Sequence, residues 1–238
     1  MLIAVPSKGR AGLTTTNKIL PNCTFYVPES ELHQYKGIVK NVVGVPITVK
    51  GITPTRNWIL KNTEEKWVVF LDDDVKNAGY NLALERQMKK KDILNESFWE
   101  KEFIKYFDIC EQLGFKIWGV KTESAPRGVY PYKPFLFKSY VTASCMGIIN
   151  DSEYYFDEKY KVKEDYEICL RHIKDKGGIL AVRYLHWEND HWDKEGGCKD
   201  YRTEQIEKDC IKMLIKDYPG MVRSAKRKAN QFTIALNL

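Results

Sequence analysis

The chain has 238 residues, of which 43 % are hydrophobic and 29 % charged; this balance permits a large buried core and excludes collagen-like, low-complexity and wholly disordered proteins. No apolar stretch approaches the roughly 18 residues that a membrane-spanning helix needs, so the sequence predicts no membrane span. The short apolar run Met1–Val5 has no basic leader and ends at Pro6, which argues against a secretory signal and for the cytoplasm. A net charge of +6 permits a polyanionic partner.

No repeat, linker or low-complexity tract marks a domain boundary, so we predict a single domain over residues 1–238. The cysteines are widely spaced and contain no C-x-x-C pair, which favours reduced thiols over a disulfide scaffold or a zinc site. They are Cys23, Cys110, Cys145, Cys169, Cys198 and Cys210.

Apolar runs alternate with amphipathic helices along the chain. Strands are predicted at Leu2–Pro6, Phe25–Pro28, Val42–Val45, Trp67–Leu71, Phe115–Val120 and Ile179–Tyr184. Helices are predicted from an N-cap at Thr53 to about Lys61, from a capping box at Ser97 to Gly114, from Glu164 to Gly177, and around Ile206–Leu214 before Pro219. The alternation predicts an α/β fold with a mostly parallel sheet flanked by helices, in which ligands bind beyond the carboxyl ends of the strands.

Three consecutive aspartates, Asp72, Asp73 and Asp74, directly follow the apolar strand Trp67–Leu71. Adjacent carboxylates repel one another, so the run costs free energy unless a cation or solvent relieves it. At the carboxyl end of a buried strand, such hard oxygen ligands suit Mg²⁺ or Mn²⁺ bound to a diphosphate. A solvated acidic turn is the alternative that the tripeptide alone leaves open.

Two segments before the aspartates could bind a nucleotide. Arg56 and Asn57 lie in the first turns of the helix predicted from Thr53, where an arginine and free backbone N–H groups can bind phosphate. A surface arginine beside a local turn bond of the asparagine is the alternative. The loop after the first strand is small and basic, as a nucleotide site or a plain surface loop would be, and its candidates are Pro6, Ser7, Lys8 and Arg10.

An acidic pair, Glu164 and Asp165, opens a predicted helix. Carboxylates at this position complement the helix dipole, which accounts for many such pairs. The functional interpretation is that one carboxylate accepts a proton from an attacking hydroxyl.

Two of the four histidines, His186 and His191, lie in a Trp-rich segment after the strand Ile179–Tyr184, and we expect this segment to be a polar loop. A metal-ligand role and a structural role are equally open for them. Arg202, with the preceding Gly196-Gly197, could hold phosphate or belong to a surface turn.

The order of these landmarks resembles that of GT-A glycosyltransferases. Gly51–Leu60 followed by Val68–Asp74 is similar to the family-two glycosyltransferase pattern of an Ala-Arg-Asn helix before the metal-binding strand. From Val5–Arg10 onward, the chain resembles the TET/JBP-associated glycosyltransferases of bacteriophages, which are inferred to glycosylate hydroxymethylated pyrimidines in DNA. The resemblance implies a GT-A (Rossmann-like) fold, and the host cytoplasm if a phage encodes the chain.

Position by position, the resemblance implies that Asp74 ligates Mn²⁺ or Mg²⁺ and that Asp72 contacts the nucleotide ribose or the metal. The third aspartate leaves the register of the motif open. Asp165 would be the catalytic base of an inverting transfer, with Glu164 beside it, and His191 or His186 would be a late metal ligand. The donor-binding residues would be Pro6, Ser7, Lys8, Arg10, Arg56, Asn57, Asp73 and Arg202, and Thr142–Gly147 would be the acceptor-side glycine loop.

We therefore predict metal-dependent transfer of a sugar from a nucleotide sugar, with a UDP-sugar as the expected donor and hydroxymethylpyrimidine DNA as the expected acceptor. The basic stretches Lys89–Lys91 and Arg223–Lys228 could meet phosphates or be solvated surface, and Trp58, Trp187 or Trp192 could stack on a flipped base or on sugar. The alternatives are a metal-dependent nucleotidyltransferase and a non-catalytic nucleic-acid-binding module on a transferase-like fold. The chain lacks a Gln-x-x-Arg-Trp segment, which argues against a processive polysaccharide synthase.

Overall fold

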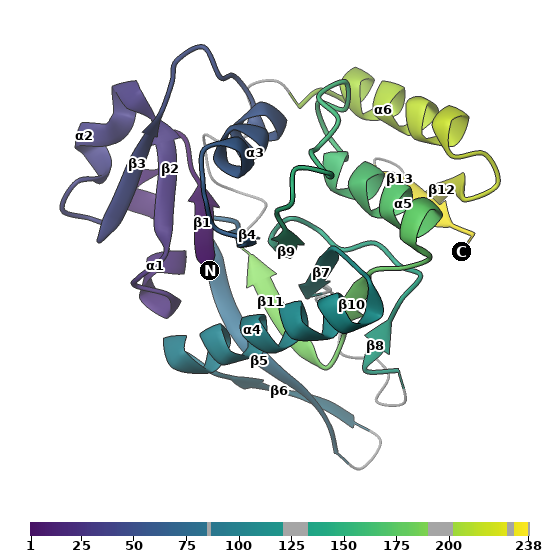
Figure 1. Ribbon diagram of the computed structural model, residues 1–238, viewed down its shortest axis with the longest axis horizontal. Coiled ribbons are helices and arrows are strands. Elements are labelled where there is room, and N and C mark those ends of the chain that lie inside the picture. The colour runs from purple at the N-terminus through teal and green to yellow at the C-terminus, as the bar shows by residue number, and fades with distance from the viewer. Residues whose placement is uncertain (85–86, 121–132, 190–201, 228–230, 238) are drawn as a thin grey trace.

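The computed structural model describes residues 1–84, 87–120, 133–189, 202–227 and 231–237; within them, only the backbone is described at 82–84, 87–90, 226–227 and 231–233. A large sheet forms the centre of the molecule, and helices lie on both of its faces (Figure 1). Its eight strands are β1 (Leu2–Pro6), β2 (Thr24–Pro28), β3 (Asn41–Val45), β4 (Trp67–Leu71), β7 (Ile117–Val120), β8 (Phe135–Leu136), β9 (Cys145–Ile149) and β10 (Leu180–Val182).

The order of the strands in this sheet is β3-β2-β1-β4-β9-β7-β10-β8. Six strands run in one direction, and β9 and β8 run against them. Because Leu2–Ala4 of β1 pairs in parallel with Val68–Phe70 of β4, the residues that follow these two strands emerge side by side. Antiparallel β9 begins at Cys145 opposite Leu71, which brings the residues just before β9 to the same edge.

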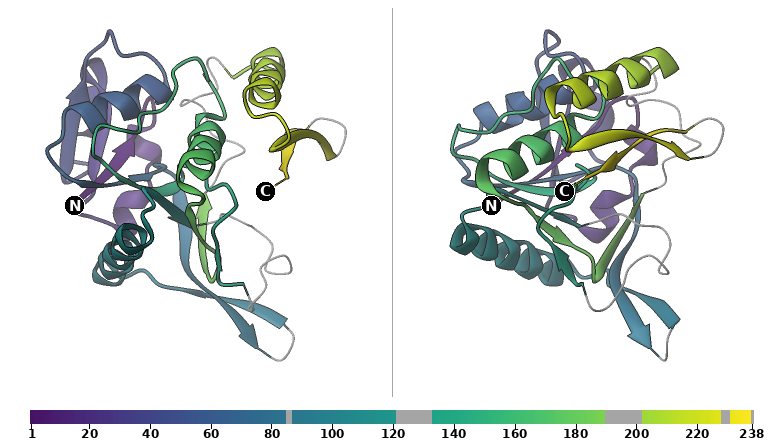
Figure 2. Two further views of the ribbon diagram at one scale, coloured as in Figure 1. Left: turned by 45° about the vertical axis from the view of Figure 1, so that its right-hand side comes forward. Right: turned by 90° about the vertical axis from the view of Figure 1, so that its right-hand side faces the viewer.

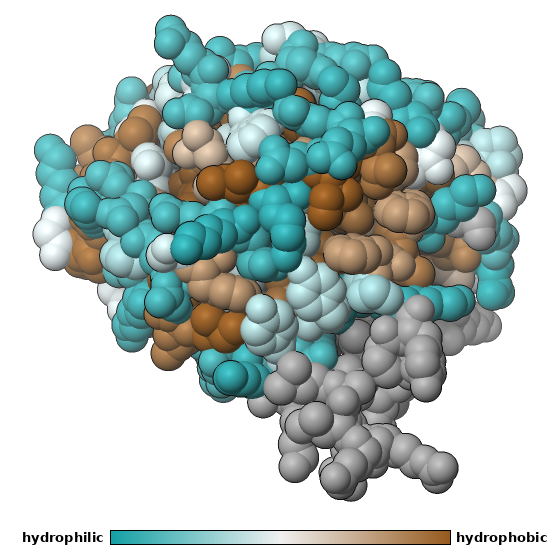
Figure 3. All heavy atoms as spheres, turned by 60° about the horizontal axis from the view of Figure 1, so that its bottom comes forward, coloured by the Kyte–Doolittle hydropathy of each residue, from teal (hydrophilic) through white to brown (hydrophobic). Residues whose placement is uncertain are grey.

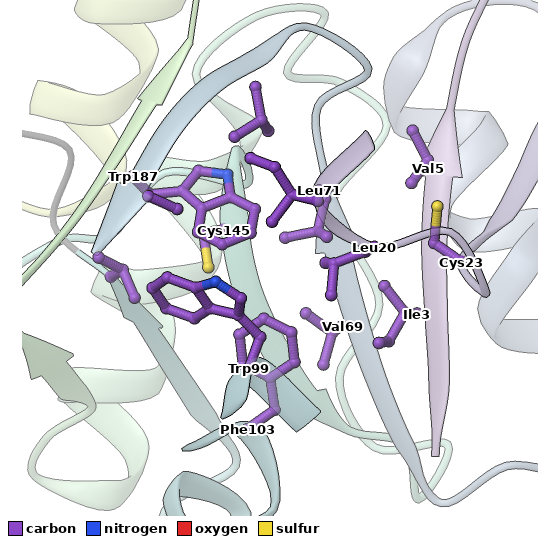
Figure 4. Packing of buried hydrophobic residues seen from close by; sticks show 14 of the residues in the cluster. Ile3, Val5, Leu20, Cys23, Val69, Leu71, Trp99, Phe103, Cys145 and Trp187 are labelled. Atoms are coloured by element: carbon purple, nitrogen blue, oxygen red, sulfur yellow. The ribbon is translucent and has the colours of Figure 1, made fainter. Parts of the chain in front are cut away.

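The continuous apolar run of β4 is covered on both faces. Val69 and Leu71 face a cluster that contains Trp99 and Phe103 of α4 (Glu96–Leu113), as Figure 4 shows. The alternate residues of β4 belong to the cluster of the opposite face, with residues of α3 (Ile52–Lys61) and α5 (Glu164–Lys176). The period of two therefore places successive side chains in different layers. The short helices are α1 (Thr16–Ile19), α2 (Leu32–Tyr35), and the 3₁₀ turns η1 (Ala11–Leu13) and η2 (Glu29–Glu31).

The described residues also form two smaller sheets. β11 (Leu185–Asn189), β5 (Val75–Leu84) and β6 (Gln87–Asp92) form an antiparallel sheet, and the β5–β6 hairpin projects from the body of the molecule (Figure 1). At the C-terminal end, α6 (Glu204–Asp217) lies alongside α5, with the β12 (Val222–Arg227) and β13 (Gln231–Leu236) hairpin beside it (Figure 2). A third apolar cluster joins α6 and this hairpin to Leu170 of α5.

Several local predictions were wrong in detail. The N-cap of α3 is Gly51 (φ 97°), not Thr53, whose hydroxyl donates to the carbonyl of Tyr160. The N-cap of α4 is Asn95, whose side chain accepts from the backbone N–H of Phe98, so the predicted capping box at Ser97 does not start the helix. Asparagine before a helix offers the same kind of side-chain acceptor as serine, and Asn95 precedes Ser97 by two residues.

The segment 186–189, predicted as a loop, is most of strand β11. Its Trp187 is fully buried and meets Trp99 edge-on at 5.0 Å between ring centroids (Figure 4). The prediction that Trp187 could stack on a base or sugar is therefore wrong, because its ring belongs to the core.

Among the described residues, no helix is long and apolar enough to cross a membrane. The large hydrophobic side chains that stay exposed lie at separate positions along the chain, among them Ile47, Leu94 and Leu113. On the face shown in Figure 3, hydrophobic side chains form separate areas between hydrophilic ones.

Candidate active site

The three aspartates after β4 face two different surroundings. Asp73 and Asp74 are buried, whereas the side chain of Asp72 is 32 % exposed. The Arg10 guanidinium donates from Nη1 to Asp73 at 3.0 Å and to Asp74 at 3.1 Å, and the Ser7 hydroxyl donates to the other oxygen of Asp73. Burial raises the pKa of Asp73, and the hydrogen bond of Ser7 and the charge of Arg10 oppose that rise. The loop after β1 thus supplies the countercharge for the loop after β4.

Hydrogen bonds to the backbone carbonyls of the aspartates fix their loop against the start of α1. The Thr15 N–H donates to the Asp73 carbonyl at 2.9 Å, and the Thr16 hydroxyl donates to the Asp72 carbonyl at 2.6 Å. The β1 side is fixed in turn by Tyr35, whose hydroxyl lies 2.8 Å from Ser7 Oγ and accepts from the Arg10 N–H at 3.1 Å. Neither Tyr35 nor the threonines were predicted from the sequence, because their positions depend on a fold that joins distant segments.

Arg56 connects the aspartates to the acidic pair. It is buried, donates from Nη1 to Glu164, and places Nη2 4.0 Å from Asp72 Oδ1. Its guanidinium also lies 5.9 and 5.6 Å from the ring centroids of Phe70 and Phe156. The structure therefore brings together Arg56, Glu164 and Asp72, with Arg56 as the bridge.

Burial disfavours the charged form of both carboxyl groups at the start of α5, Glu164 and Asp165. Burial raises the pKa of Glu164 to about 7, while the charge of Arg56 opposes the rise and that of Asp165 adds to it. Burial likewise raises the pKa of Asp165, against the charges of Arg56 and Lys163 and hydrogen bonds from the backbone of Tyr166 and Ala143. The second of these bonds comes from the loop before β9. Raised pKa values of carboxyl groups next to a candidate metal site are typical of groups that exchange protons in catalysis.

The loop before β9 closes this edge of the site. The Asp72 N–H donates to the Ser144 carbonyl at 3.4 Å, and the hydroxyls of Thr142 and Ser144 lie 2.6 Å apart. Of the predicted glycine loop Thr142–Gly147, the first three residues form this loop and the rest belong to β9. Gly147 is required by packing, since a Cβ there would lie 2.1 Å from the Trp118 indole.

Asn189, which was not predicted from the sequence, is a further residue at the aspartates. Its Nδ2 donates to Asp72 Oδ2 at 2.8 Å. A β-bulge causes this placement, because Glu188 pairs with Asn77 and Asn189 pairs with Val75, directly after Asp74. The only sequence signal was its position within the Trp-rich segment, between Trp187 and Trp192.

Other predicted site residues lie apart from this centre. Asn57 is buried and forms two 2.9 Å hydrogen bonds with the backbone of Phe156, one as donor and one as acceptor. It also donates to Glu158 at 2.9 Å, and these bonds fix the chain before α5. Arg202 is bonded to Glu207 of α6 at 2.5 Å. Lys8 is exposed next to Ser7, and Pro6 is the last residue of β1.

The two histidines have different outcomes. His186 is 1 % exposed, and its ring nitrogens lie 3.2 Å from the Tyr80 carbonyl and 3.0 Å from Asp92 Oδ1. These contacts give His186 a structural place between β11, β5 and β6. His191 lies outside the described residues, as do Trp192 and Gly196-Gly197.

The aspartates and Asn189 fit a divalent cation by their chemistry. Asp74 Oδ1 and Asn189 Oδ1 are buried oxygens without a hydrogen-bond partner among the described residues, while Arg10 holds the other oxygen of Asp74. No group of three or more His, Cys, Asp or Glu side chains in the described ranges could enclose a metal. Mg²⁺ in particular binds through one or two carboxylates together with substrate phosphates and water, so a two-carboxylate edge suits it.

Comparison with known proteins gives a family and a fold. The sequence profile of the family described as TET-Associated Glycosyltransferase matches residues 1–197. No curated protein matches the chain.

Among solved structures, the chain resembles residues 1–349 of S. aureus TarS in complex with UDP-GlcNAc, with a TM-score of 0.55 and 10 % identity over 90 % of this chain and 67 % of that one. It also resembles glucosyl-3-phosphoglycerate synthase from Mycobacterium tuberculosis in complex with Mn²⁺ and UDP-Glc, with a TM-score of 0.54 and 9 % identity over 98 % and 85 % of the two chains. At such identities the likeness shows the fold alone, and it confirms the predicted GT-A α/β class.

Proposed function

Since the chain belongs to the TET-Associated Glycosyltransferase family, we propose that it transfers a sugar from UDP to a hydroxymethylated pyrimidine in DNA, with a divalent cation and with inversion at the anomeric carbon. The observation that carries this proposal is the Arg56 bridge, which sets a carboxylate edge suited to a metal diphosphate beside the acidic pair Glu164 and Asp165, which is suited to proton transfer. The family membership supports a glycosyltransferase over the nucleotidyltransferase alternative.

The donor side is assigned to the edge formed after β1 and β4. Asp74 and Asp72 would hold Mn²⁺ or Mg²⁺, with Asn189 at Asp72, and the bound ion supplies the positive charge that stabilises the leaving diphosphate. Arg10 and Ser7 orient the aspartates by the hydrogen bonds described above. Support for this donor class comes from the solved neighbours, one described with UDP-GlcNAc and another with Mn²⁺ and UDP-Glc.

The acceptor side is assigned to the start of α5. Asp165 would accept the proton of the attacking hydroxyl, and its raised pKa brings it nearer to the pH at which a general base works efficiently. Glu164, which accepts a hydrogen bond from Arg56, would keep the Arg56 guanidinium between Glu164 and Asp72. A base on the side opposite the leaving group gives inversion, since the hydroxyl then attacks in line.

DNA as the acceptor is supported by the family description and by charge at the edges of the molecule. Lys89, Lys90 and Lys91 are in β6 of the projecting hairpin, and Arg223 is exposed on β12. Lysine and arginine at such edges can contact phosphates without reading sequence. A pyrimidine in a duplex would have to be flipped out to reach Asp165.

The test combines product analysis with Asp165→Asn. With UDP-glucose, Mn²⁺ and a duplex containing hydroxymethylcytosine, or the same duplex with hydroxymethyluracil, we expect labelled DNA and released UDP. The Asp165→Asn protein should bind UDP as the unmodified protein does and lose about 10²- to 10⁴-fold in transfer rate. Near-normal turnover would reject the base and favour a retaining mechanism. DNA binding without transfer of any nucleotide sugar would favour the non-catalytic module.

A further inference from the structure

Lys163, the residue directly before the acidic pair, has an unusual backbone conformation. It is the N-cap of α5, with φ 63° and ψ 22° in the left-handed region, and its side chain makes no capping hydrogen bond. Residues other than glycine, asparagine and aspartate rarely adopt this conformation, and such strain persists only where surrounding contacts enforce it. The direction in which Glu164 and Asp165 leave the turn depends on it.

The contact that holds Lys163 comes from α6. Lys163 Nζ lies 2.8 Å from Glu207 Oε2, and the two side chains are only 9 % and 11 % exposed. Arg202 donates to the other Glu207 oxygen at 2.5 Å. Lys163 Nζ also lies 5.4 Å from the centroid of the Tyr166 ring. Glu207 thus accepts a hydrogen bond from Arg202 at one oxygen and forms a nearly buried ion pair with Lys163 at the other, which gives the pair a more defined geometry than an exposed pair has.

α6 is itself fixed to the site helix. The Tyr218 hydroxyl, just after α6, donates to Glu167 of α5 at 2.6 Å, and Tyr160 donates to Asp217 at 2.8 Å. Apolar packing in the third cluster joins the same elements. The position of Glu207 relative to the start of α5 is therefore set by contacts at more than one place, although Glu207 lies beyond the residues that the family profile matches.

We propose that Glu207 is a positioning residue for sugar transfer: through its ion pair with Lys163 it fixes the left-handed turn and the ammonium group beside Asp165. This inference rests on the proposed function, since it takes Asp165 as the base. α6 thereby contributes to the acceptor side of the site without touching either substrate. The charge of Lys163 is among the influences that oppose the raised pKa of Asp165.

The experiment measures kcat, KM for UDP-glucose and the pH dependence of kcat/KM, with the hydroxymethylpyrimidine duplex as acceptor. Glu207→Gln should lower kcat about 10- to 100-fold, as small displacements of a reacting group do, and leave KM unchanged. Glu204→Gln is the matched control, because Glu204 is also in α6 but pairs with Lys208 in solvent. Lys163→Arg should retain activity, since it keeps the charge.

Lys163→Gly separates the side chain from the turn, because glycine adopts the left-handed conformation without strain. We expect the same loss of kcat, and an acid limb of kcat/KM that moves to higher pH because a positive charge near Asp165 has gone. The other charged or titratable groups facing Asp165 in the described structure, namely Arg56, Glu164, Tyr166 and Cys169, stay in place. A purely structural pair would lower the melting temperature without moving that limb.

Full activity and an unmoved acid limb in both Glu207→Gln and Lys163→Gly would overturn the inference. If Glu207→Gln does not fold, the double variant with Lys163→Gly removes both charges and leaves no lone buried ion, and the same two readouts apply. Loss of activity in Asp165→Asn with normal activity in the Glu207 variants would refute this inference alone. Normal activity in Asp165→Asn would instead refute the proposed base and this inference with it.

Discussion

Replacement of Glu164 by glutamine should change how stability depends on pH. Glu164 is buried, and burial raises the pKa of its carboxyl to about 7 from an ordinary 4.5. The folded protein therefore binds this proton more tightly than the unfolded chain does. The stabilisation is fully present below about pH 4.5 and is lost as the pH rises through about 7; a shift of this size corresponds to about 3 kcal/mol.

The measurement is the free energy of unfolding from urea titrations between about pH 4.5 and 8. The difference between the unmodified protein and Glu164→Gln should fall by about 3 kcal/mol over that range, because glutamine has the same shape and does not titrate. Taking the difference cancels contributions of groups present in both proteins, apart from the coupling of Glu164 to Asp165. Parallel curves for the two proteins would refute a protonated, buried Glu164.

The remaining predictions use the same protein and similar readouts. Burial lowers the pKa of His172 to about 4, so its contribution to stability is lost as the pH falls from about 6.5 through 4. The unfolding free energy of His172→Gln should therefore fall by about 3 kcal/mol less than that of the unmodified protein over this pH range, and equal falls would contradict the buried neutral histidine. Asp74→Asn should abolish Mn²⁺-dependent UDP binding in calorimetry and leave the fold intact, because Arg10 still binds Asp73 at 3.0 Å. The control Asp209→Asn, at an exposed position, should bind UDP with Mn²⁺ normally. Wild-type affinity in Asp74→Asn would contradict the assignment of Asp74 as a metal ligand. His186→Ala should lower the melting temperature without weakening Mn²⁺-supported UDP binding, since the ring bonds to Tyr80 and Asp92; a specific loss of Mn²⁺ affinity would restore it as a ligand.

The layers of the fold could be predicted because they depend on local pattern. The β4 run Trp67–Leu71 is apolar at every position, which is typical of a strand covered on both faces, and the helix ending at Gly114 has a left-handed C-terminal glycine. The strands β5, β6, β8, β9, β11, β12 and β13 were not predicted. Polar and basic residues such as Lys89–Lys91 in β6 carry little strand signal, and β9 contains a glycine that packing against Trp118 requires.

The acids of the site were easier to predict than the residues that position them. Consecutive carboxylates repel one another, and the free-energy cost of this repulsion at Asp72–Asp74 can be inferred directly from the sequence. Asn57 lies next to Arg56 in sequence and was expected at the donor, yet its side chain joins the backbone of Phe156. A helix turns by about 100° per residue, so adjacent side chains diverge by that angle. Which of the two faces the site depends on how the helix packs.

Asn189 shows the limit of local pattern at the site and allows a final test. One bulge between β5 and β11 moves its pairing to Val75 and thereby brings its amide to Asp72 at 2.8 Å. A hydrogen bond to a charged group contributes about 1.5–3 kcal/mol, so Asn189→Ala should weaken Mn²⁺-supported UDP binding about 10- to 100-fold if Asp72 must be held in place for the donor. Asn77→Ala is the control, because Asn77 pairs with the neighbouring Glu188 at 3.4 Å and does not contact the aspartates in the described structure. Calorimetric titration of UDP with Mn²⁺ decides the matter: equal affinities for the two alanine variants and the unmodified protein would show that Asn189 supports the strand rather than the donor site.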